Sequence, residues 1–433
     1  MSMTGINIKK YLNLSTVINR KVFYILFLCM IALTIFRIIV TFKDNQLIDF
    51  VCHFDSSTAV CNNLNPYDLK NLKHFEWDCP PIVFPGTFLF FTPLLPLDLE
   101  LAKIIHLSLN IIAACCLVYL FFKKAGMLDD FDYKKPDVKA LLILFLAFIF
   151  LNSTPVMMSF RLGQNTVFLT LFLVLCLYCR NKWVRVTLFA VSAVTKYTML
   201  TLLAPALFLK KNYLFCIVSF MLFVLFAISP VLCGHNIINL YHNYAELVHK
   251  YISTGFNTYA ESGYSMLNIG FFKLNIINIL GKLLFVILAG YIIVRDRRQN
   301  SFGMNFLLSI MCITMLLSYH RLHDIHLIML LILAEFYFFM LNNDKINMLI
   351  SAAFIVFFAA PFSLVLSLSH LITKLPHIDS IFHTCNYYPQ KRDVFPLSAV
   401  VFLLLTIYSL YLYFYKREEV IFKLNESKPD GTD

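Results

Sequence analysis

Long apolar segments, many of them about 20 residues in length, restrict this chain to one class of fold. A helix of that length crosses the hydrocarbon core of a bilayer and satisfies its own backbone hydrogen bonds there. The segments occupy residues 22–42, 99–122, 139–158, 165–180, 184–209, 212–232, 274–294, 302–319, 323–341, 345–370 and 395–415. The sequence therefore predicts an all-α, polytopic membrane protein.

The composition agrees with this prediction. Of the 433 residues, 59% are hydrophobic and 14% are charged, whereas a soluble domain is nearer half apolar and a quarter charged. A formal net charge of +11 raises the question of nucleic-acid binding, but the lysines and arginines lie in short clusters beside apolar segments. Membrane topology explains such clusters, because basic loops stay on the cytoplasmic side.

The basic clusters also predict the orientation of the segments. The clusters within 9–21, 123–135 and 180–185 place the N-terminus and two later connections inside. Lys210 and Lys211 lie inside as well only if segment 184–209 enters and returns as a helical hairpin. We favour that hairpin over a single crossing, because it keeps every basic cluster inside. The expected architecture is thus about 10 full crossings plus one re-entrant hairpin.

This topology predicts a single membrane domain, residues 22–415, between a cytoplasmic N-terminus (1–21) and a cytoplasmic tail (416–433). The expected external loops are 43–98, 233–273 and 371–394. A short, broken helix at the membrane interface is predicted between Pro81 and Leu97. One helical face in the second loop has the pattern of a helix that lies on lipid. Its residues are Ile237, Tyr241, Tyr244, Val248 and Tyr251.

Cysteines in the expected external loops allow one or two disulfides, although their spacing does not identify the pairs. They are Cys52, Cys61, Cys79 and Cys385.

Short polar motifs in this apolar chain gather on the expected external side. Asp49 follows the first apolar segment, and Arg161, Gln164 and Asn165 belong to an RLGQN sequence at the start of a later one. A positioned carboxylate can accept the proton of an attacking hydroxyl, although Asp49 could equally be a solvated loop acid. A helix start with an arginine suits a phosphate, although a helix cap with an interfacial arginine would look the same.

Two further polar motifs lie within or between apolar segments. Lys196 would stand inside the predicted hairpin, where an ammonium is costly unless it faces an anion or a cavity. Its partner could be a lipid-linked phosphate or an acid within the protein. His320 and His323 belong to the turn SYHRLHDIHL, in which Asp324 and His326 also lie. Their spacing is compatible with a metal site, but a role in proton transfer or in phosphate binding explains them without one.

The order of these motifs resembles that of a known family. IDF, NPYD, CPP and PLLPL come first, followed by GQN at the start of a helix, a lysine in a broken apolar segment and the histidine-rich turn. This order is similar to that of the polyprenyl-phosphate-dependent glycosyltransferases of family 87, membrane enzymes of the GT-C architecture. The resemblance covers roughly residues 20–340. CPP in place of Tyr-Pro-Pro, and Tyr197 where the family has proline, depart from the pattern.

The resemblance implies transfer of one monosaccharide, mannose or another hexose or pentose, from a polyprenyl phosphate. The acceptor would be a hydroxyl of a glycolipid or glycan on the extracytoplasmic face of the inner or plasma membrane, and the transfer would proceed with inversion. Asp49 would be the catalytic base, assisted by His320, although the family histidine aligns with His320 or His323. The donor-binding residues that the resemblance implies are Arg161, Gln164, Asn165, Lys196 and His323.

We expect neither a cofactor nor an essential metal, because basic side chains can stabilise a phosphate leaving group. The alternative function is a transporter or flippase of lipid-linked sugars. Such proteins usually carry inverted repeats and ionisable residues near the membrane midplane. This sequence has no evident repeat, and its charged motifs gather at one face.

Overall fold

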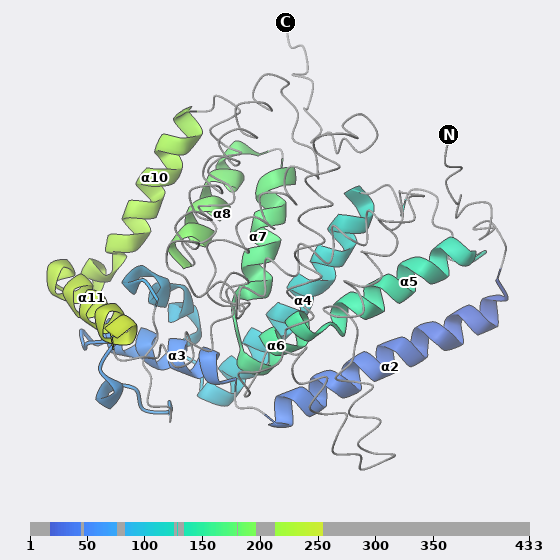
Figure 1. The fold of residues 1–433 in the computed structure, drawn as a ribbon, viewed down its shortest axis with the longest axis horizontal. Helices are drawn as coiled ribbons and strands as arrows, with labels where there is room; N and C mark the ends of the chain where they lie inside the picture. The colour runs from blue at the N-terminus through green and yellow to red at the C-terminus, as the bar shows by residue number, and fades with distance from the viewer. Residues whose placement is uncertain are drawn as a thin grey trace, which may run out of the picture.

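The computed structural model describes residues 18–44, 47–75, 83–124, 128, 134–179, 181–195 and 213–253. The regular elements of this part are helical, as predicted (Figure 1). They are α2 (Arg20–Asp44), α3 (Ile48–Cys61), η1 (Leu69–Asn71), η2 (Pro85–Leu94), α4 (Leu99–Lys124), α5 (Val138–Leu151), α6 (Thr154–Leu162), α7 (Thr166–Tyr178), α8 (Lys182–Thr195), α10 (Tyr213–Ile228), η3 (Ser229–Cys233) and α11 (Ile237–Ser253). Lys196, with the expected hairpin turn, and His320 and His323 lie outside the described residues.

Within the described ranges, two helices are long and apolar enough to cross a membrane, namely Arg20–Ile39 in α2 and Leu99–Leu120 in α4. A third candidate is the pair Ile217–Cys233 and Ile237–Lys250, bent by 109°, if the two parts form one broken span. Large apolar side chains stay exposed on these helices, among them Leu28 at 62%. Such continuous exposure suits contact with lipid rather than with water.

The apolar segment 139–158, expected to be one crossing, is broken in the structure. Helix α5 ends at Leu151, and α6 begins at Thr154 with Pro155 in its first turn. A proline lacks the N–H that a continuous helix would need, so the chain restarts there. Asn152 at the break ties α2 to this corner: its carbonyl accepts a hydrogen bond from Arg37 Nη1 (2.7 Å), and its Nδ2 donates to Thr34 Oγ1 (2.8 Å).

The short broken helix expected between Pro81 and Leu97 is the 3₁₀ helix η2, with Pro93 inside it. It packs against α3, α8 and α10. Gly86 lets η2 approach α10 closely, because a Cβ at this position would overlap the carbonyl oxygen of Phe226. Thr87 Oγ1 donates to the Val194 carbonyl in α8 (3.0 Å). Helix η2 therefore packs inside the protein, beside α3.

Helix α11 corrects part of the prediction for its apolar face. Tyr244 lies 5.4 Å from Phe84 and 5.7 Å from Tyr67 between ring centroids, and Tyr241 donates a hydrogen bond to the Ala227 carbonyl (3.0 Å). The expectation that this face lies on lipid is therefore wrong for both tyrosines, which pack on the protein. Spacing alone shows that a face is apolar, and it does not show what covers that face.

Of the four cysteines in the expected external loops, Cys52 and Cys61 form no disulfide. Cys79 and Cys385 lie outside the described residues.

Candidate active site

Asp49 stands in the first turn of α3. A carboxylate is favoured there, because the first turn of a helix presents unpaired N–H groups and the positive end of the dipole. Leu47, two residues before Asp49, is fully buried and has a left-handed backbone with φ of 51°. Such a conformation costs a leucine about 1–2 kcal/mol and persists only where packing holds it. The start of α3 is therefore set by tertiary contacts rather than by local preference.

The RLGQN turn supplies those contacts. Gly163 between α6 and α7 has φ of 70°, and a Cβ built on it would lie 2.7 Å from Phe50 Cβ and 3.0 Å from Leu47 Cβ. Only glycine combines this backbone angle with so close an approach. The turn thus rests directly on the residues that flank Asp49, although more than 100 positions separate the two motifs in the sequence.

Within the turn, the predicted site residues take different positions. Gln164 and Asn165 directly precede α7, and Thr166 Oγ1 donates to Gln164 Oε1 (3.2 Å). Arg161 is exposed in the last turn of α6, at the end of a helix rather than at its start as expected. A cation suits a helix C-terminus electrostatically, so its position alone does not require a ligand.

His106 of α4 joins the two segments. Its ring stacks on Phe50, with centroids 4.5 Å apart and an interplanar angle of 28°. Its Nε2 lies 3.0 Å from the Gly163 carbonyl oxygen, and the histidine is 4% exposed. A carbonyl accepts, so this nitrogen carries the proton in that bond. One buried imidazole therefore touches both α3 and the RLGQN turn.

Sequence reasoning missed His106, and a signal for it was present. Lys103, His106 and Asn110 are buried polar residues spaced three and four apart inside a membrane-length segment. This spacing puts them on one helical face, and polar residues in such a segment mark functional sites by default. Asn110 Nδ2 donates to the His106 carbonyl (3.1 Å), whereas its buried Oδ1 has no hydrogen-bond partner among the described residues.

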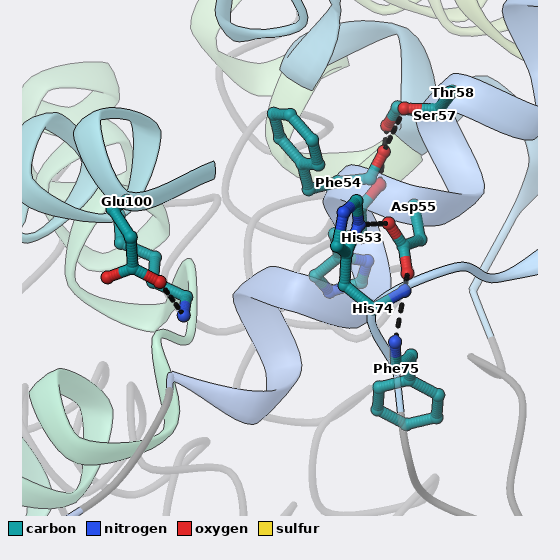
Figure 2. A network of polar contacts seen from close by, with 9 residues as sticks. His53, Phe54, Asp55, Ser57, Thr58, His74, Phe75 and Glu100 are labelled. Atoms are coloured by element: carbon teal, nitrogen blue, oxygen red, sulfur yellow. Dashed lines mark hydrogen bonds and ion pairs between the residues drawn. The ribbon is translucent and has the colours of Figure 1, made fainter. Parts of the chain in front are cut away.

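A second polar network fixes the other side of α3 (Figure 2). The Asp55 carboxylate is 2% exposed and accepts hydrogen bonds from the backbone N–H groups of His74 (2.6 Å) and Phe75 (3.0 Å). His74 Nδ1 lies 2.7 Å from Asp55 Oδ1. Three contacts on one buried carboxylate anchor the returning chain to α3. Asp55, which the sequence shows only as one of several acids near Asp49, is therefore a structural anchor.

The NPYD motif also has a structural role. Asn65 Oδ1 accepts from the backbone N–H of Tyr67 (3.0 Å), and Asp68 Oδ1 accepts from that of Lys70 (3.1 Å), so both side chains shape the turn. Tyr67 donates to the Val83 carbonyl (2.8 Å). Burial, with Tyr244 and Tyr241 nearby, raises the pKa of Tyr67 well above its usual value. Tyr67 therefore stays a neutral donor that ties this turn to the chain entering η2.

The geometry thus brings two of the predicted motifs together, the start of α3 and the RLGQN turn, around a histidine that was not predicted. Comparison with known proteins adds an independent finding. The model of a protein family described as glycosyltransferase family 87 matches residues 85–319. Arg161, Gln164, Asn165 and Lys196 fall inside the matched range, and Asp49 precedes it. No curated protein matches the chain.

Proposed function

The chain belongs to glycosyltransferase family 87, and from that premise we propose that it transfers a sugar from a polyprenyl phosphate to a hydroxyl acceptor outside the cytoplasm. The protein is a glycosyltransferase, and its described helices include membrane-length ones. A polyprenyl-linked donor fits such helices, because its isoprenoid tail dissolves in the bilayer and its phosphate stays at the surface. The acceptor would be a glycolipid or a glycan.

One observation supports a reaction centre at the start of α3. Asp49 stands there in a first turn whose neighbours, Leu47 and Phe50, press against Gly163 of the RLGQN turn. The helical turn that carries Asp49 is thereby in contact with the turn that leads into α7. A carboxylate and a helix start are the two parts that hydroxyl activation and phosphate binding require. Strained backbone at Leu47 is also of the kind that clusters at functional sites.

In the proposed reaction, the acceptor oxygen attacks the anomeric carbon of the sugar while its proton passes to the Asp49 carboxylate. The bond from that carbon to the phosphate oxygen breaks, and the polyprenyl phosphate leaves with the electron pair. Attack opposite the leaving group inverts the anomeric centre. Arg161, Gln164, Asn165 and Lys196 would hold the donor, and His320 or His323 would assist. Positive side chains would stabilise the charge that grows on the phosphate.

The test is sugar transfer by the purified protein from a synthetic polyprenyl-phosphate sugar. We expect Asp49→Asn to lower kcat by about 10²- to 10⁴-fold, the usual contribution of a general base. The matched control is Asp68→Asn, because Asp68 is exposed and asparagine caps the η1 turn equally well. Full activity of Asp49→Asn would refute the mechanism. Movement of the lipid-linked sugar across the bilayer without transfer would indicate a flippase instead.

The proposed topology, about 10 crossings with a re-entrant hairpin and the site facing outward, has its own test. Single cysteines would replace Lys70 in the first expected external loop and Lys211 beyond the hairpin, in a background without other cysteines. We expect a membrane-impermeant thiol reagent, added from outside, to label position 70 and to leave position 211 unlabelled. Labelling at 211 would mean that segment 184–209 crosses once.

A further inference from the structure

Two faces of α4 differ sharply in character. Apolar side chains are exposed along one face, for example Leu101 at 42%, Ile104 at 51% and Ile112 at 58%. The opposite face carries the buried residues Lys103, His106 and Asn110, which are 7%, 4% and 1% exposed. His106 contacts the RLGQN turn, and Asn110 hydrogen-bonds to His106. Lys103 is not explained by that contact.

Lys103 is a buried ammonium with a weak anchor. Its Nζ lies 2.7 Å from Glu100 Oε1, and the Glu100 side chain is 69% exposed. Among the described residues, Glu100 is the one polar partner of Lys103, although an ammonium can donate three hydrogen bonds. An ion pair with a hydrated partner on the same helix holds a side chain only weakly. A buried lysine in a membrane-length helix normally has a stronger partner.

The residues next to Lys103 on α4 contact the start of α3 and the RLGQN turn. Its neighbour Ala102 packs in one buried cluster with Leu47 and Phe50, the residues that flank Asp49. One turn further along α4, His106 contacts Gly163. Lys103 therefore stands on α4 between two residues, Ala102 and His106, that contact the start of α3 and the RLGQN turn.

We propose that Lys103 binds the phosphate of the lipid-borne sugar donor, and that Glu100 holds the ammonium until this phosphate replaces it. The inference rests on the proposed function and adds a residue to the donor site. The phosphate of a membrane-borne donor stays near the membrane surface, so it meets an end of a membrane-length helix; Glu100 stands exposed in the first turn of α4 and can turn into water when it is displaced. A phosphate offers several acceptor oxygens to the N–H donors of Lys103 that pair with no described residue, and its charge increases as the sugar leaves.

The experiment measures binding of a short-chain polyprenyl phosphate to the full-length protein in phosphatidylcholine nanodiscs, with the matching polyprenol as control. We expect Lys103→Met to weaken binding of the phosphate roughly 10- to 100-fold, as for the loss of a charge-assisted hydrogen bond. The KM for the sugar donor should rise by a similar factor. Binding of the polyprenol should not change, and Lys103→Arg should retain most of the phosphate affinity.

Glu100→Gln provides the decisive variant, because Glu100 is exposed and its replacement should not disturb folding. If the carboxylate competes with the phosphate, Glu100→Gln strengthens polyprenyl phosphate binding several-fold. If the pair is only a structural ion pair, the same change leaves binding unaltered or weakens it, and the proposal is overturned. Unchanged binding by a folded Lys103→Met protein would also overturn it.

Two further outcomes separate the possible failures. Equal competition by phosphatidylglycerol would identify Lys103 as a site for bulk anionic lipid and would refute a specific role with the donor. Transfer by the wild type with unchanged donor KM in both Lys103→Met and Glu100→Gln would refute this inference and leave the proposed function standing. Lys103-dependent phosphate binding without any sugar transfer would refute the proposed function and leave this inference standing.

Discussion

Gly163 lies so close to Phe50 that a Cβ on the glycine would come within 2.7 Å of the phenylalanine Cβ. Through this contact the RLGQN turn fixes the start of α3, where Asp49 stands. Because the backbone of Gly163 lies directly against the Cβ atoms of Phe50 and Leu47, a side chain added at Gly163 must move one segment relative to the other.

Gly163→Ala should damage both stability and activity. The new methyl group meets a left-handed backbone and the Phe50 and Leu47 side chains, so we expect a loss of about 2–4 kcal/mol. Thermal unfolding in detergent and the rate of sugar transfer would measure these effects.

Gly234→Ala is the matched control for this change. Gly234 has φ of 85°, but a Cβ there would find its nearest atom 3.7 Å away in Asn63. We expect only the cost of the backbone conformation, about 1–2 kcal/mol, and normal transfer in the folded fraction. Similar losses of activity in both variants would contradict the coupling.

His106→Phe should keep an aromatic ring against Phe50 but leave the Gly163 carbonyl without its donor. An unsatisfied buried carbonyl costs about 1–3 kcal/mol. If His106 positions the turn, kcat should fall by about tenfold or more, because small displacements of catalytic groups are costly. Steady-state kinetics at several donor concentrations would separate kcat from KM.

His235→Phe tests whether such a loss is specific. His235 Nε2 bonds the Val60 carbonyl (2.8 Å) near the other end of α3, so the substitution removes the same kind of bond away from the candidate site. We expect a comparable drop in thermal stability with kcat preserved. A reduced kcat in both variants would indicate general loosening of α3.

Asp55→Asn should destabilise the protein more than His74→Ala. The first change removes a charge that accepts two backbone N–H bonds, at a cost of about 1.5–3 kcal/mol. The second removes a side chain that is 47% exposed and leaves both backbone bonds in place. Thermal unfolding, together with limited proteolysis between residues 62 and 75, would rank the two. The reverse ranking would show that the imidazole, rather than the carboxylate, anchors this segment.

The raised pKa of Tyr67 predicts that the stability of the folded protein falls at alkaline pH. Its pKa in the folded protein is raised by burial, so the folded state binds the phenolic proton more tightly than the unfolded chain does. The contribution of Tyr67 to stability is therefore fully present below about pH 10, the pKa of an unperturbed tyrosine. It is lost as the pH rises further.

The measurement is the melting temperature of wild type and Tyr67→Phe between about pH 8 and pH 11. Tyr67→Phe should lose about 1 kcal/mol at neutral pH, from the missing bond to the Val83 carbonyl, and should decline less steeply above about pH 10. Parallel curves for the two proteins would show that Tyr67 does not supply the alkaline sensitivity.

Much of the fold and part of the site follow from local patterns. Apolar segments of membrane length predict α2 and α4 directly. In hydrocarbon the backbone must satisfy its own hydrogen bonds, and a helix does this within one segment. The prolines near residue 90 predict a short helix before α4, and the motif order predicts the family that the comparison then identified. The break at Asn152 and Ser153 was not predicted, since hydrophobicity alone gives no signal where a Thr-Pro step restarts a helix.

The sequence by itself determined that this is a helical membrane glycosyltransferase, because segment length, composition and motif order are properties of the chain taken locally. Tertiary structure decided that Asp49 lies beside the RLGQN turn, that His106 joins the two, and that Tyr244 of α11 packs on Phe84 rather than on lipid. These are contacts between distant segments. They depend on how helices break and cross, and side-chain periodicity carries no information about which partner covers a given face.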